Sequence, residues 1–165
     1  MLPGKSRQCA DGSQEEQGTG TLCVGWFWQL RGQWPDAVVV ASGSTSFFTF
    51  VVLSSAEAVR SYGPDLAAIA ATGARALLLT AAGAPGSGAD YVLRVFGPNV
   101  GIDEDPATGS IHCTLAPYWA DRLGKDKLRA EQLSLRGGSM QCAIAGHRVT
   151  IAGRARLYLH GAIEI

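Results

Sequence analysis

Short β-branched and aromatic runs alternate with Ser- and Gly-rich breaks along most of the chain. Four such runs have the length and composition of strands: residues 37–41, 47–53, 75–81 and 90–96. Two short helices are predicted between the second and third runs. The first follows a capping serine at Ser54 or Ser55, and the second begins at Pro64 and stops at Gly73. This pattern predicts an α+β domain.

A longer helix is predicted from Gly109 to about Leu123. Its first half, S-I-H-C-T-L-A, is apolar nearly all round, which is typical of a helix enclosed by a sheet. Pro117 removes one backbone hydrogen bond inside this helix, so we expect a kink or break near Ala116.

The end of the chain returns to short strands separated by glycine turns. Residues 125–129 are charged and are interpreted as a surface connection. Four predicted strands follow: residues 132–136, 140–145, 148–152 and 155–160. Together they predict a β-meander around the helix.

The start of the chain has a different composition. Residues 1–20 are polar and rich in Gly, Ser and Gln, which predicts a disordered tail. Trp26, Phe27, Trp28 and Trp34 then lie close together; they form either an apolar segment folded against the domain or an exposed patch left by a truncated or misassigned reading frame. We therefore place one domain at residues 37–165, after a disordered or poorly defined segment at residues 1–36.

Charge and cysteine spacing exclude several functional classes. Fourteen basic residues balance fourteen acidic ones, so no net field attracts nucleic acid or an anionic membrane. The four cysteines form no C-x-x-C pair and no zinc-finger spacing, which favours free thiols in a reducing cytosol and argues against a metal site. No run of about 18 apolar residues exists to span a bilayer. These features predict a cytoplasmic globular protein.

The candidate chemistry is concentrated in one loop, R-V-F-G-P-N-V-G-I-D-E-D-P-A-T-G-S. The loop brings the carboxylate of Asp105 to the start of the long helix, where unpaired N–H groups and the helix dipole favour anions. Gly109 allows a ligand to approach the backbone, and Thr108 or Ser110 could cap the helix. The alternative interpretation of Asp105 is an Asp-Pro turn that only closes the loop. For His112, either packing in the core or orienting the site from behind remains open.

The block E-D-P-A-T-G-S-I-H-C-T-L-A-P-Y-W, followed by Q-L-S-L-R-G-G from Gln132, resembles the PhzF (phenazine biosynthesis-like) family. The resemblance covers about residues 37–165 and matches only the C-terminal half of that family. It implies one lobe of a diaminopimelate epimerase-like fold, in which a mixed or antiparallel sheet wraps around a central helix and the active site lies between two lobes. The family's general base, a glutamate, belongs to the other lobe.

The same resemblance implies a cofactor-independent isomerase or epimerase that moves a proton on a small carboxylic acid. Asp105 and Ser110 would be catalytic, Thr108, Gly109 and Ser110 would bind the substrate, and His112 would orient the site. The alternative is a non-catalytic binding or interaction module that retains the anion site. In either case we expect the lobe to form a homodimer or to join a missing N-terminal lobe, and to be inactive alone.

Overall fold

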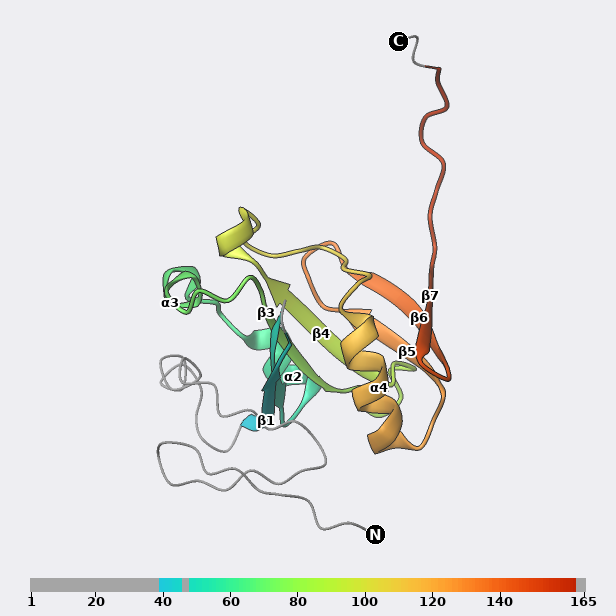
Figure 1. The fold of residues 1–165 in the computed structure, drawn as a ribbon, viewed down its shortest axis with the longest axis horizontal. Coiled ribbons are helices and arrows are strands. Elements are labelled where there is room, and N and C mark those ends of the chain that lie inside the picture. Colours follow the sequence, from blue (N-terminus) through green and yellow to red (C-terminus); the bar gives the residue numbers. More distant parts are fainter. Residues whose placement is uncertain (1–38, 46–47, 163–165) are drawn as a thin grey trace.

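A computed structural model of the chain describes residues 39–45 and 48–162. The predictions for residues 1–36, including the Trp-rich stretch, lie outside this range. Seven strands form a single sheet in the order β1 to β7 (Figure 1). Their bounds are β1 Val39–Ser44, β2 Thr49–Leu53, β3 Leu77–Ala82, β4 Tyr91–Phe96, β5 Lys127–Gln132, β6 Gly138–Ala145 and β7 Arg148–Gly153.

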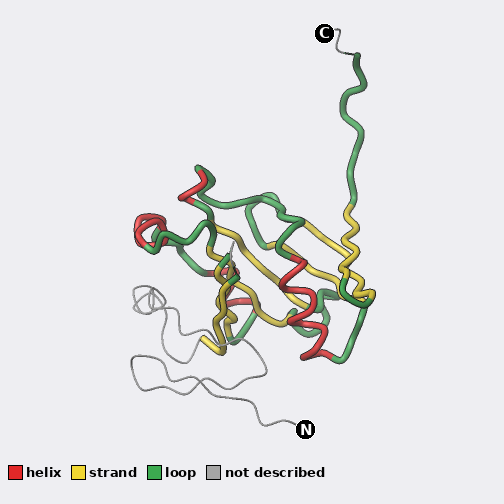
Figure 2. Tube along the Cα trace, in the orientation of Figure 1, coloured by secondary structure: helices red, strands yellow, loops and turns green. Residues whose placement is uncertain are grey.

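The sheet is mixed because two of its strand pairs are parallel. β2 pairs parallel to β3 and β4 pairs parallel to β5, whereas the other neighbours are antiparallel. Parallel neighbours need long crossovers, and helices occupy both (Figure 2). The first crossover holds α2 (Ala56–Ser61) and α3 (Leu66–Ala71); the second holds the 3₁₀ turn η3 (Pro98–Val100) and α4 (His112–Leu123). The α+β prediction with a mixed sheet is confirmed.

The central strands are buried on both faces. Alternate residues of β4 point to opposite sides, so one face packs on α4 and the other on α2 and α3. The α4 side of the core includes Leu93, Ile111, Leu115 and Trp119. Because α4 also contacts β5, β6 and β7, the sheet curves around this helix as the sequence predicted (Figure 1). None of the described helices is long and apolar enough to cross a bilayer.

The strand after α4 begins earlier than predicted. Residues 127–132 form β5, whereas the sequence predicts a surface connection at residues 125–129 and a strand at residues 132–136. Leu128, Ala130 and Gln132 point inward and are buried. Charged residues occupy the alternate outward positions, which gives the segment a polar average composition and hides its period of two.

Two further predictions are wrong. Residues 155–160, expected to form a strand, have no regular structure; they are exposed and extend away from the sheet (Figure 1). Their alternating pattern finds no neighbouring strand among the described residues. Of the kink or break expected near Ala116, the break is absent: α4 continues through Pro117, which lies on the exposed side of the helix.

Candidate active site

The loop that carries Asp105 is held in one conformation by short hydrogen bonds. The Asp105 amide donates to the Val95 carbonyl at 2.9 Å, which fixes the loop to the end of β4. The Ala107 amide donates to Oδ1 of Asp105 at 3.2 Å, and the Thr108 hydroxyl donates to Oδ2 at 2.6 Å. Each carboxylate oxygen therefore has one donor from the loop, and this fixes the direction of the carboxylate.

The carboxylate lies just ahead of the first turn of α4. Regular α-helix begins at His112, and residues 109–111 form a tighter turn in which the His112 amide donates to the Gly109 carbonyl. No side chain caps this end, so the predicted cap at Thr108 or Ser110 is wrong. Among the described residues, the amides of Gly109, Ser110 and Ile111 have no acceptor. These amides can receive an anion.

The space in front of this turn is open. Ser110 is exposed, and a side-chain atom added at Gly109 would meet nothing within 4 Å. The structure therefore brings Asp105, Thr108, Gly109 and Ser110 together at one helix start. A ligand that reaches the N–H groups of Gly109 and Ser110 also reaches the Asp105 loop.

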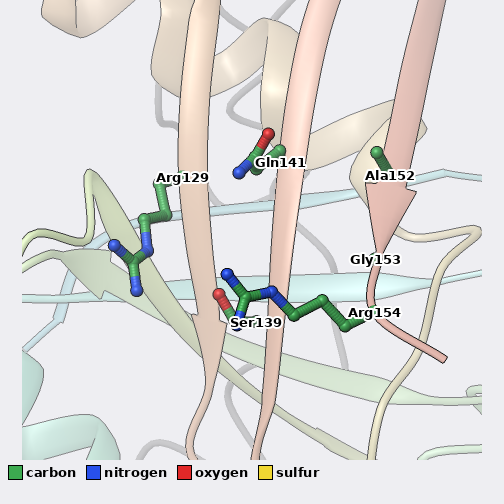
Figure 3. A pocket seen from close by; sticks show the side chains of 6 residues that line it. All are labelled: Arg129, Ser139, Gln141, Ala152, Gly153 and Arg154. Carbon is green, nitrogen blue, oxygen red and sulfur yellow. The ribbon is translucent and has the colours of Figure 1, made fainter. Parts of the chain in front are cut away.

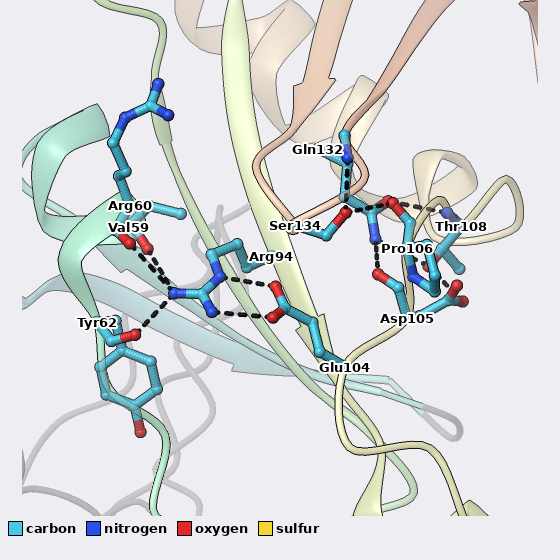
Figure 4. Close-up of polar contacts among 11 residues, drawn as sticks. Val59, Arg60, Tyr62, Arg94, Glu104, Asp105, Pro106, Thr108, Gln132 and Ser134 are labelled. Atoms are coloured by element: carbon cyan, nitrogen blue, oxygen red, sulfur yellow. Dashed lines mark hydrogen bonds and ion pairs between the residues drawn. The ribbon is translucent and has the colours of Figure 1, made fainter.

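The Gln132 side chain holds this loop by hydrogen bonds to its backbone. The sequence alone does not identify Gln132 as a site residue. Its side chain is only 2% exposed. Its amide nitrogen donates to the Asp105 carbonyl at 2.5 Å, and its amide oxygen accepts from the Thr108 amide at 2.8 Å (Figure 4). The available signal was the Q-L-S-L-R-G-G segment that begins at this residue.

The same segment provides two more contacts to the loop. The Ser134 hydroxyl donates to the Pro106 carbonyl at 2.6 Å. At Gly138, an added side-chain carbon would lie 3.0 Å from the side chain of Ala107, so only glycine fits without displacement. The end of β5 and the start of β6 therefore form a platform under residues 105–108.

Glu104, the residue before Asp105, belongs to a different cluster. Arg94 binds both of its carboxylate oxygens, at 2.7 and 3.0 Å. The same guanidinium donates to the carbonyls of Tyr62 and Arg60, at 2.7 and 3.2 Å, near the end of α2. Figure 4 shows Glu104 and Asp105 directed toward separate groups of residues. Glu104 therefore joins the loop to α2.

His112 lies in the core behind the helix start. It is fully buried, and its Nδ1 lies 2.6 Å from the Tyr91 hydroxyl. Burial lowers the pKa of His112 from 6.5 to about 4, so the ring is neutral at pH 7. No hydrogen bond joins it to Asp105 or Thr108 within the described part of the chain, and its role as an orienting residue stays a prediction.

A pocket lies on another part of the molecule, away from the Asp105 loop. A pocket of about 360 Å³ is formed along β5, β6 and β7 by Arg129, Ser139, Gln141, Ala152, Gly153 and Arg154 (Figure 3). All six residues are exposed, and none belongs to the Asp105 loop. No group of three or more His, Cys, Asp or Glu side chains that could hold a metal ion is present in the described ranges.

Comparison with known proteins places these features in a family. The family described as "Phenazine biosynthesis-like protein" (PhzC-PhzF) matches residues 26–161. An uncharacterized isomerase of Pseudomonas aeruginosa is 50% identical over 115 residues, which cover 70% of this chain and 43% of that protein. The mouse phenazine biosynthesis-like domain-containing protein 2 is 45% identical over 103 residues, which cover 59% of this chain and 36% of that protein.

A solved structure gives the same result. A phenazine biosynthesis PhzC/PhzF protein from Clostridium difficile superposes with a TM-score of 0.69 at 38% identity, over 83% of this chain and 51% of that one. The chain thus spans about half the length, or less, of the relatives it matches. Because the family match includes the Asp105 loop, α4 and the Gln132 platform, the chain belongs to the PhzF (phenazine biosynthesis-like) family.

Proposed function

We propose that this chain supplies one half of a cofactor-independent isomerase that shifts a proton on a small carboxylic acid. Asp105 transfers the proton, and the N–H groups of Gly109 and Ser110, with the Ser110 hydroxyl, hold the substrate carboxylate. A glutamate on an opposing lobe is the second acid-base group. The observation that carries this proposal is the oriented Asp105 carboxylate at the same helix start as the N–H groups of Gly109 and Ser110, which have no acceptor within residues 39–45 and 48–162. The isomerase names of the Pseudomonas relatives support it.

The physical argument rests on orientation. A proton-transfer group works when it lies within hydrogen-bond reach of the reacting carbon's proton and keeps that position. Both oxygens of Asp105 accept a hydrogen bond from the loop, and each retains a lone pair for a substrate. The helix start binds the carboxylate of the substrate, and Asp105 acts on a different part of the substrate.

Ligand binding can be tested on the chain as it is. Amide NMR shifts during titration with anthranilate, a small aromatic carboxylate, should be largest at residues 105–112. Ser110→Ala should weaken binding by about 1 kcal/mol, or about fivefold, the usual net effect of one hydrogen bond. Shifts confined to residues far from this loop would contradict the anion site.

Turnover requires both acid-base groups. Each such group contributes roughly 10²- to 10⁴-fold, so we expect no detectable turnover from this chain alone. Fusion to the N-terminal half of the Pseudomonas relative should restore turnover, and Asp105→Asn should lower it again. Binding without turnover in a folded fusion would favour the alternative, a non-catalytic binding module. Turnover by the unfused chain that is lost in Asp105→Asn would place the base within this lobe or in a second copy.

A further inference from the structure

The buried amide of Gln132 has a definite orientation that is set by its neighbours. Its oxygen lies 2.8 Å from the Thr108 amide, which can only donate, and its nitrogen lies 2.5 Å from the Asp105 carbonyl, which can only accept. Exchanging the two ends would place donor against donor and acceptor against acceptor. The second hydrogen on the Gln132 nitrogen points to the Thr108 hydroxyl oxygen at 3.3 Å.

Two contacts together fix where the Thr108 hydroxyl sends its hydrogen, because the Asp105 carboxylate can only accept and the Gln132 nitrogen can only donate. A hydroxyl has one hydrogen to donate and two lone pairs to accept with. One lone pair of Thr108 Oγ1 receives the hydrogen from Gln132, and the hydroxyl hydrogen is donated to Oδ2 of Asp105 at 2.6 Å. Gln132, Thr108 and Asp105 therefore form a chain of hydrogen bonds with a single direction, ending at the carboxylate (Figure 4).

We propose that Gln132 is a positioning residue. Through the Thr108 hydroxyl it orients the Asp105 carboxylate, so that Oδ2 accepts the Thr108 hydrogen bond. The catalytic meaning of this assignment rests on the proposed function, but the hydrogen-bond chain itself does not. In this arrangement the hydrogen of Thr108 goes to Asp105 and not to a ligand. Thr108 therefore acts on the substrate through Asp105.

Gln132 is separable from the other supports of the loop. The Asp105 amide still donates to the Val95 carbonyl, and the Ser134 hydroxyl still donates to the Pro106 carbonyl, when the Gln132 side chain is changed. The loop is thus anchored on both sides of Asp105 without Gln132. A change at Gln132 should alter the direction of the Asp105 carboxylate, whereas a change at Ser134 should leave that direction in place.

The first test uses NMR on the full chain without ligand. In the parent chain, the Thr108 hydroxyl proton should exchange slowly and show proximity to Asp105. In Gln132→Glu, which keeps the size and the acceptor for the Thr108 amide but lacks both donors, this proton signal should disappear and the Asp105 carboxyl ¹³C signal should move. Gln132→Met, which has similar length and no polar end, should also move the Asp105 carboxyl ¹³C signal. The matched control Ser134→Ala should leave both signals in place.

The second test is a double-mutant cycle on kcat in the fusion protein. Gln132→Glu and Thr108→Val should each lower kcat about 10- to 100-fold, the scale of a misplaced catalytic group. The double variant should be no slower than the slower single variant, because both changes break one chain. Additive losses, or NMR signals unchanged in Gln132→Glu, would overturn the proposal. A fusion without turnover would count against the proposed function alone, because the NMR result is independent of it.

Discussion

Nδ1 of His112, at the start of α4, lies 2.6 Å from the hydroxyl oxygen of Tyr91 in β4, and both side chains are fully buried. The other ring nitrogen of His112, Nε2, has no hydrogen-bond partner within the part of the chain that the structure describes. Burial raises the pKa of the Tyr91 hydroxyl, with a further contribution from Cys142, so the tyrosine stays neutral. The pair is therefore a neutral hydrogen bond within the core.

This pair predicts that stability falls in mild acid. The folded-state pKa of His112, about 4, lies below its ordinary 6.5, so the unfolded chain takes up the proton first as the pH falls. The free energy of unfolding keeps its full value above about pH 6.5 and falls as the pH approaches 4. At pH 5 the loss should be roughly 2 kcal/mol. Urea unfolding at pH 7.5 and pH 5 measures the difference.

The matched variants are His112→Gln and His147→Gln. The first removes the buried titrating ring while keeping a polar group, and it should reduce the pH dependence. The second changes an exposed histidine in the turn between β6 and β7, and it should leave the dependence intact. An unfolding free energy that is equal at the two pH values in the parent chain would contradict the prediction.

The sequence predicts most elements because their apolar runs are long and are separated by clear Ser- and Gly-rich breaks. β2, β3 and β4 are mostly apolar runs with one polar or charged residue each, as expected of strands covered on both faces. β5 was misplaced because half of its side chains face solvent. The segment at residues 155–160 was predicted as a strand from its own pattern, but a strand needs a neighbour to pair with, and local pattern carries no information about one.

Only part of the site can be predicted from the sequence, because some of its contacts join residues that are far apart in the chain. Asp105 and Gly109 are close in sequence, so an interpretation of local chemistry could join them to one helix start. Gln132 reaches the same loop from 24 residues further along the chain, through its contact with Thr108. A glutamine in a predicted strand gives no indication of its partner, and only the register of β5 beside β4 brings it under the loop.

Gly109 provides a test that separates folding from binding. A side-chain carbon at this position meets no atom within 4 Å, and the backbone φ is not positive. Gly109→Ala should therefore leave the unfolding free energy within about 0.5 kcal/mol of the parent value. It should weaken anthranilate binding at least tenfold, because the methyl group occupies the approach to the N–H groups. Unchanged affinity in a folded variant would argue that ligands do not bind at this turn.

In contrast to Gly109→Ala, a substitution of Gly138 should destabilise the protein. Gly138→Ala places a carbon 3.0 Å from the Ala107 side chain, and the resulting crowding should destabilise the protein by about 1–3 kcal/mol. Removing the opposing methyl group in the double variant Gly138→Ala, Ala107→Gly should recover part of this loss. Urea unfolding of the parent, single and double variants measures the coupling. Equal losses in the single and double variants would show that the two side chains do not meet.

We propose that the chain self-associates through its exposed end. Leu157, Tyr158 and Leu159 are 82%, 97% and 78% exposed and adjacent. Exposed apolar side chains favour association, and symmetric dimers are its commonest product. Light scattering should show dimers that Leu157→Ser combined with Leu159→Ser converts to monomers. Leu135→Ser, at a fully exposed but isolated leucine, is the control. A monomeric parent chain at tens of micromolar would contradict this.

Substitutions of the neighbours Glu104 and Asp105 should have different effects: the first should mainly lower stability and the second should mainly lower turnover. Glu104 is 24% exposed and Arg94 12%, and the pair is bidentate, so Glu104→Gln leaves a largely buried guanidinium with one neutral partner in place of a carboxylate. The loss should be about 2 kcal/mol, between the values for exposed and fully buried ion pairs. Asp105→Asn keeps the shape of the loop and removes no ion pair, so its effect on unfolding should be smaller.

Turnover of the fusion protein should fall more in Asp105→Asn than in Glu104→Gln. Glu104 is bound by Arg94 on both oxygens and has no path to a substrate at the helix start, so Glu104→Gln should retain most of kcat wherever the variant is folded. Asp105→Asn replaces the proton-transfer group with an amide that cannot accept a proton, and kcat should fall by roughly 10²- to 10⁴-fold. Parallel urea unfolding and rate measurements on the two variants give the comparison. If Glu104→Gln abolished turnover while Asp105→Asn did not, the acid-base role would belong to Glu104, and Arg94 would have to release it on substrate binding.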